Sequence, residues 1–142
     1  AAAELRRFAL EISATVVSSP GRHEVVVRTG DAEHALAVAP KSADGGSATN
    51  GGEFLMLALA TCYCNDLYRE AARLGVPLKS VRVQARAEFA GIGVSASNVR
   101  YSATVDSDAP GDAIAHLLKE TDAVAEVHNT LRKGVPVALQ AA

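Results

Sequence analysis

The stretch that decides the fold is residues 53–75, which read EFLMLALATCYCNDLYREAARLG. From Glu53 to Leu74 it holds strong helix formers with neither glycine nor proline, and Gly75 stands where a helix commonly ends. This pattern predicts one helix of about 22 residues and about 33 Å. The first half is apolar on every side, which predicts burial all round, and the charges of the second half are expected to reach solvent. Those charged residues are Asp66, Arg69, Glu70 and Arg73.

Alternating apolar and polar residues predict antiparallel strands on both sides of this helix. The predicted strands cover residues 8–17, 25–28, 34–38, 81–89, 99–105 and 135–139. Turn-forming residues predict a loop over 40–52, and residues 108–134 predict a helical segment that continues or restarts before Gly134. Strands mostly follow strands in this order. The sequence therefore predicts an α+β fold, with antiparallel sheets packed on helices and residues 1–142 in one domain.

Composition excludes several classes of partner. Fourteen basic and sixteen acidic residues give a net charge of -2, and aromatic residues make up only 4% of the chain. A nucleic-acid partner is not expected, because such proteins usually carry a basic patch. No apolar run approaches the roughly 18 residues of a membrane span, so no membrane partner is expected. Two cysteines are too few for a disulfide scaffold, and we expect a cytoplasmic protein.

Both cysteines, Cys62 and Cys64, lie inside the predicted helix. Residues two apart on a helix point about 200° from each other, which excludes a disulfide and weakens a metal site made of the two thiolates. Cys64 falls on an apolar stripe and is interpreted as a small buried hydrophobe. Cys62 lies where the predicted helix changes from apolar to polar residues, and it is a better candidate for a nucleophile than Cys64. The alternative is a buried structural role for Cys62. Asp66, one turn further on, would oppose its ionisation, and Arg69 lies at the edge of reach.

The segment NGGEFLMLALATCYCNDLYREAARLGVPLKSVRVQARAEF, residues 50–89, resembles the OsmC/Ohr family of peroxide-reducing proteins. The signature of a cysteine after two small residues and before an aromatic one corresponds to residues 60–63. The Leu-Gly stretch that follows the family's helix corresponds to residues 74–83, and the tail at 128–139 resembles the family's last helix and strand.

The resemblance implies an intertwined homodimer that reduces small organic hydroperoxides without a metal or other cofactor. It places the peroxidatic cysteine at Cys62, a thiolate-stabilising arginine at Arg22 and an arginine-orienting glutamate at Glu53. The structural alternatives are a solvated turn for Arg22 and a favourable carboxylate at a helix N-terminus for Glu53.

Two departures from the family pattern affect the expected reaction. Glu53 stands one position later than the family's glutamate, and Ala125 stands about where the second, resolving cysteine belongs. The reaction would therefore need an external thiol reductant, and the rival hypothesis is a scaffold without catalysis that binds an apolar ligand. Nearby His128 is interpreted as a core or helix-surface residue, with a catalytic base as the alternative. A metal site based on Cys62 and Cys64 is the third hypothesis.

Overall fold

A computed structural model describes residues 9–141, and its contacts group into two compact units, with the boundary along the chain between Gly51 and Gly52. The first unit contains β1 (Ile12–Ser19), β2 (Arg22–Thr29), β3 (Ala32–Leu36), β4 (Pro40–Ser42) and β5 (Gly45–Ser47). The second contains α2 (Gly51–Leu74), β6 (Ser80–Glu88), β7 (Ser97–Asp106), α3 (Gly111–Val124) and α4 (Glu126–Lys133). Among the described residues, no helix combines the length and apolar character that crossing a membrane requires.

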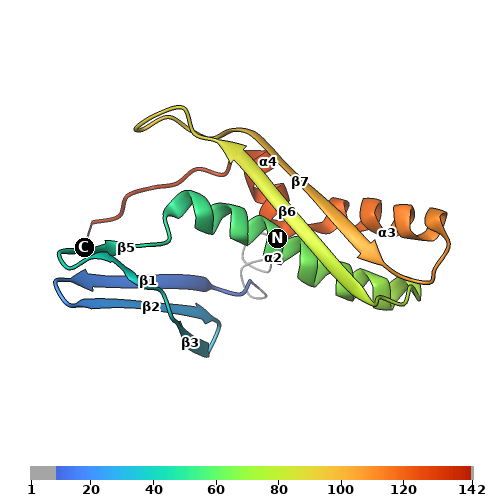
Figure 1. The fold of residues 1–142 in the computed structure, drawn as a ribbon, viewed down its shortest axis with the longest axis horizontal. Coiled ribbons are helices and arrows are strands. Elements are labelled where there is room, and N and C mark those ends of the chain that lie inside the picture. Colours follow the sequence, from blue (N-terminus) through green and yellow to red (C-terminus); the bar gives the residue numbers. More distant parts are fainter. Residues whose placement is uncertain (1–8, 142) are drawn as a thin grey trace. The chain divides into compact units, whose positions relative to one another are not determined.

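The first unit is an antiparallel meander, β1-β2-β3, with the small β4-β5 hairpin (Figure 1). Ser19 pairs with Arg22 across the tight turn between β1 and β2. The first residue of the strand predicted at 8–17 lies outside the described residues. The strand begins later than predicted, at Ile12, and runs two residues further, to Ser19. The prediction of a loop over residues 40–52 was wrong, because β4 and β5 form a hairpin there, which the glycines of this stretch permit. Gly45 and Gly46 have positive φ angles, which glycine adopts at little cost.

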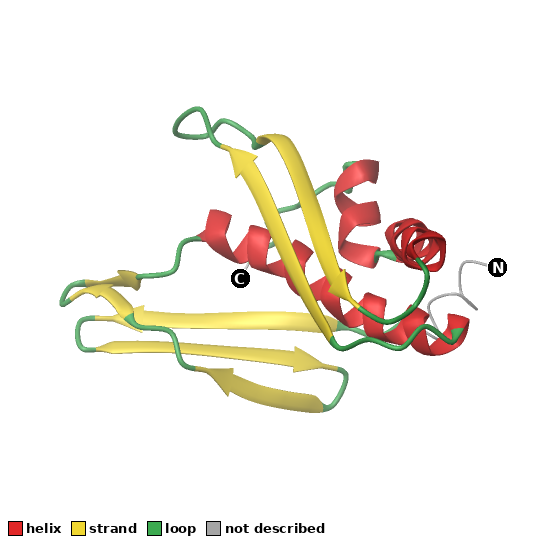
Figure 2. Ribbon diagram, turned by 45° about the vertical axis from the view of Figure 1, so that its right-hand side comes forward, coloured by secondary structure: helices red, strands yellow, loops and turns green. Residues whose placement is uncertain are grey.

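The second unit packs the β6-β7 hairpin against α2 and α3 (Figure 2). Strands β6 and β7 confirm the predicted pair, with Val81 opposite Val105. The core contains Tyr63, Leu67 and Leu117, together with apolar residues of the inner face of the hairpin. Because alternate strand residues face inward, the arginines of β6 remain exposed.

Helix α2 confirms the predicted long helix and ends as expected at Gly75, which adopts a φ of 70°. Its burial differs from the prediction. The first half is not buried all round, since Leu57 is 56% exposed. In the second half, Asp66 and Glu70 do not reach solvent as expected but are buried, with 4% and 6% of their surface exposed. Arginines three residues further on pair with both carboxylates and reach the solvent instead.

The strand predicted at 135–139 is not formed within the described chain. Val137 and Leu139 are fully exposed there. A strand needs a neighbouring strand to satisfy its backbone groups, and Pro136 lacks an N–H to donate. The apolar alternation that predicted the strand therefore has no partner in this single chain.

Candidate functional site

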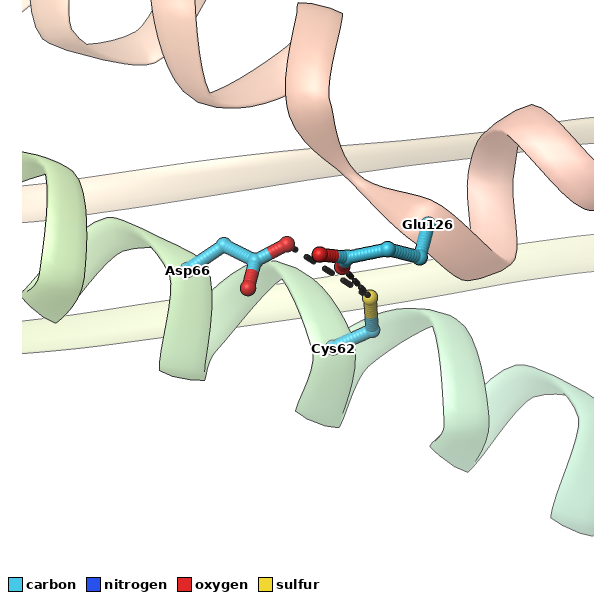
Figure 3. A group of neighbouring side chains, drawn as sticks. All are labelled: Cys62, Asp66 and Glu126. Carbon is cyan, nitrogen blue, oxygen red and sulfur yellow. Dashed lines mark hydrogen bonds between the residues drawn. The ribbon is translucent and has the colours of Figure 1, made fainter. Parts of the chain in front are cut away.

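Cys62 lies half-buried on α2, beside the start of α4, with two carboxylates facing its sulfur (Figure 3). The Sγ atom is 3.7 Å from Asp66 Oδ2 and 3.7 Å from Glu126 Oε2, so the single thiol proton can be donated to either oxygen. Asp66 is one helical turn along α2, which the helix repeat explains. Glu126 comes from a segment 64 residues away. The sulfur therefore sits in a small acidic cluster built from two helices.

A break between two helices brings Glu126 to the thiol. Helix α3 ends at Val124, Ala125 adopts an extended conformation with ψ of 107°, and α4 begins at Glu126. Ala125 is fully buried, so the break lies within the core. A larger side chain would disturb this close packing. The family resemblance placed the missing resolving cysteine at Ala125, and this segment does lie beside Cys62.

Arg69 holds the two carboxylates together by their other oxygens. Its Nη1 lies 3.0 Å from Asp66 Oδ1 and 3.7 Å from Glu126 Oε1. Each carboxylate therefore uses one oxygen for the guanidinium and turns the other toward the Cys62 sulfur. The single positive charge offsets part of the repulsion between two neighbouring negative charges.

The electrostatics of the cluster favour a protonated thiol. Burial raises the pKa of Cys62, and the negative charges of Asp66 and Glu126 raise it further, against the lowering effect of a hydrogen bond from the Val127 backbone. Burial and the nearby Glu126 also raise the pKa of Asp66, whereas a hydrogen bond from its own backbone lowers the pKa of Glu126. The predicted opposition of Asp66 to thiol ionisation is thus confirmed, and Glu126 adds to it.

The other predicted site residues are distributed over the two units. Arg22 starts β2 in the first unit, where it donates to Glu24 Oε2 at 2.8 Å and both side chains are exposed. Its assignment to the thiol stays a prediction. Glu53 lies in the first turn of α2, nine residues before Cys62. On one continuous helix that separation is about 13.5 Å along the axis and about 180° around it, so the two residues face opposite sides.

His128 is a core residue, with 3% of its surface exposed. This agrees with one of the two interpretations that the sequence allowed. Its ring packs against Tyr101 at a centroid distance of 4.4 Å and against Tyr63 at 5.9 Å. Tyr101 donates to Asp122, which also accepts from Arg132 Nη2 at 2.7 Å. Burial, followed by the charge of Arg132, lowers the pKa of His128, and Asp122 opposes this effect.

The cluster also bears on the metal hypothesis. Cys62 Sγ and one oxygen from each of Asp66 and Glu126 lie within 4.8 Å of one another, and thiolates and carboxylates are zinc ligands. Cys64 does not belong to this group, and both cysteines are free thiols, in keeping with their divergence on the helix. Arg69 already supplies a positive charge to both carboxylates. A metal-binding hypothesis would therefore rest on Cys62 with the two acids rather than on the two cysteines.

Fold and site together define an α+β protein with a cysteine at the middle of a long helix. The profile of the OsmC-like protein family matches residues 44–140, and the chain belongs to that family. This confirms the predicted family and fold class.

Solved structures show the same fold at low sequence identity. An OsmC-like protein from Mycoplasma pneumoniae has a TM-score of 0.61 and 13% identity, covering 87% of each chain. A hypothetical protein from Aquifex aeolicus has a TM-score of 0.64 and 12% identity, covering 89% of each chain. The organic hydroperoxide resistance protein OsmC from Legionella pneumophila has a TM-score of 0.55 and 18% identity, covering 84% of this chain and 89% of that one. No curated protein matches the sequence.

Replacing one acid of the cluster should activate the thiol. In a Cys64→Ser background, Glu126→Gln removes a negative charge from beside Cys62, so the thiol pKa should fall. Alkylation by iodoacetamide at neutral pH should then speed up by roughly threefold to tenfold, since one pKa unit is a tenfold change in ionisation. The matched control is Glu70→Gln, which also removes a carboxylate paired with an arginine of α2 but lies outside the cluster. Equal rates in the two variants would show that Glu126 does not act on the thiol.

His128 should make stability depend on pH. Its pKa is lowered in the folded protein, so between that value and the ordinary value near about 6.5 the unfolded chain binds more protons. The free energy of unfolding in urea should therefore be highest above about pH 6.5 and fall toward pH 5. His128→Leu should flatten this slope, and His116→Gln, at an exposed position on α3, should leave it in place. An unchanged slope in His128→Leu would contradict this account.

Proposed function

We propose that this OsmC-like protein is a thiol-dependent peroxidase that reduces small organic hydroperoxides through Cys62. The observation that carries the proposal is the pair of carboxylate oxygens, each 3.7 Å from the Cys62 sulfur. They give the thiol proton an acceptor within the protein, so the sulfur does not have to ionise into solvent before it reacts. Membership of the family supports the same chemistry.

The reaction begins with attack of the Cys62 sulfur on the terminal oxygen of the hydroperoxide. A sulfur–oxygen bond forms as the oxygen–oxygen bond breaks, so the sulfur loses two electrons and the peroxide gains them. Asp66 or Glu126 takes up the thiol proton and passes it to the leaving alkoxide. The products are a Cys62 sulfenic acid and an alcohol.

An external thiol restores the enzyme in this proposal. Cys64 is the second of the two cysteines in the chain, and it points away from Cys62 on the same helix. It therefore cannot act as the resolving thiol within one chain. One molecule of reductant condenses with the sulfenic acid, releasing water and leaving a mixed disulfide. A second displaces Cys62 as a thiol and leaves with the oxidised reductant. A cytoplasmic location would provide such thiols.

The proposed active unit is a homodimer in which residues 1–142 form a single OsmC-like domain. Glu53 faces away from Cys62 on its own helix, and Leu57 on the same half of the helix is exposed. A second copy packed along this half of α2 would bury Leu57. We assign Arg22 and Glu53 of the second copy to each Cys62, where the arginine would offset the local negative charge.

A specific observation favours the rival function, a non-catalytic scaffold that binds an apolar ligand. The pKa of Cys62 is raised, whereas reactive cysteines ordinarily have lowered values. If Arg22 of the second copy does not compensate for this, the thiol is inert. The two hypotheses differ in what Cys62 does when it meets a peroxide.

Limiting cumene hydroperoxide should oxidise Cys62 and spare Cys64. The expected product is a sulfenic acid that dimedone traps at Cys62, read by peptide mass spectrometry. It should form much faster than in free cysteine, because in the proposed dimer Arg22 offsets the two acids and one of these acids takes up the thiol proton during the attack. Zinc content is measured on the same sample, since bound zinc would block the thiol. Equal, slow modification of both cysteines would support the scaffold instead.

Arg22→Ala should raise the pKa of Cys62 and slow peroxide reduction, because it removes the positive charge assigned to the thiolate. The control is Arg28→Ala, a second exposed arginine on the same strand that pairs with Glu33. The thiol pKa is read from thiolate absorbance in a Cys64→Ser background. Similar effects of the two substitutions would return Arg22 to a solvated surface role.

Mixed dimers test whether sites are shared between copies. Chains carrying Cys62→Ser are combined with chains carrying Glu53→Ala, and each parent homodimer should be inactive. A heterodimer should regain one intact site, because the thiol of one chain meets the glutamate of the other.

The mixing experiment needs verified heterodimers of folded variants. No recovery of activity in them would refute shared sites, and so would a stable, fully active monomer at micromolar concentration.

A further inference from the structure

A cavity separate from the Cys62 cluster lies between α2, β7 and α4. Its volume is about 460 Å³, within the range of small-molecule sites. Leu59, Val99 and Leu131 provide apolar walls, and Arg100 and Arg132 provide the charged lining. No carboxylate belongs to the lining among the described residues. The cavity thus combines an apolar body with positive charge.

His128 adds a buried polar group to the wall of this cavity. Neither of its ring nitrogens has a hydrogen-bond partner among residues 9–141, although the side chain is almost fully buried. Buried polar groups nearly always have a partner, so an unpaired imidazole beside an open cavity points to a polar ligand atom.

The two arginines have different capacities for an anion. Arg132 is already engaged with Asp122 at 2.7 Å and mainly shapes the wall. Arg100 Nη1 donates to the Asn98 carbonyl at 2.8 Å and lies 3.5 Å from Glu88 Oε1, a long contact between exposed groups. Arg100 also stands directly opposite Arg86 in the hairpin register. Like charges directly opposite each other in a sheet repel. An anion beside Arg100 would relieve this repulsion.

We propose that this cavity binds a small organic carboxylate with an apolar body. The carboxylate lies against Arg100 and accepts a hydrogen bond from His128, while the hydrocarbon part packs on Leu59, Val99 and Leu131. The site is independent of the proposed peroxidase reaction, since none of the three groups of the Cys62 cluster lines it.

The test uses benzoate as probe and benzamide as its uncharged counterpart. Benzoate should bind saturably in calorimetry, and its amide resonance changes should map to β7 and α4, with shifts at the His128 ring nitrogens. Benzamide should bind at least about tenfold more weakly, because it lacks the charge that Arg100 recognises. Binding should persist in Cys62→Ser, which separates this site from the proposed peroxidase activity.

Substitutions decide whether Arg100 is the recognition group. Arg100→Gln should weaken benzoate binding by about tenfold. Arg82→Gln, at an exposed arginine on β6 outside the cavity, should leave it unchanged. The proposal is overturned by any of three results: no saturable binding of benzoate at millimolar concentration, equal binding of benzamide, or equal effects of the two arginine substitutions. Resonance changes centred on Cys62 would also overturn it.

Discussion

The bridge that Arg69 makes between Asp66 and Glu126 is the interaction on which the site depends. It joins a residue of α2 to the first residue of α4, and it keeps one oxygen of each acid directed at the Cys62 sulfur. Two carboxylates this close would repel each other strongly in a partly buried place without a cation between them. The exposed guanidinium provides that cation and stays hydrated.

A second arginine repeats the arrangement one turn further along α2. Arg73 pairs with buried Glu70 at 2.8 Å and lies 3.8 Å from Glu120 on α3. The two arginines thus connect α2 to both helices that follow the β6-β7 hairpin. Exposed ion pairs contribute little on their own, but here one acid of each pair is buried, and its loss of hydration must be compensated. The packing around Leu117 and Ala125 then fixes the helix break that presents Glu126.

The sequence predicted the elements whose signals are local. The long helix, its end at Gly75 and the β6-β7 pair follow from periodicity and from glycine chemistry. The proximity of Asp66 to Cys62 follows from the helical repeat alone. Glu126 could not be found in this way, because it reaches the sulfur only through the packing of a helix break 64 residues later.

Long-range packing also explains two of the predictions that were wrong. Asp66 and Glu70 are charged residues on a polar face, and only their arginine partners allow them to be buried. The strand predicted near Val137 has the right apolar pattern but no neighbouring strand in one chain. The assignment of Arg22 to the thiol stays a prediction, because it depends on contacts that periodicity does not encode.

The most direct test of this account is the pKa of the Cys62 thiol after Arg69→Gln, in a Cys64→Ser background. Thiolate absorbance followed against pH gives the value for the variant and its parent. The account predicts a higher thiol pKa in Arg69→Gln, because two acids then face the sulfur without the cation that offsets them. An unchanged or lower pKa in a folded variant would contradict it, since Arg69 would then not control the charge at the thiol.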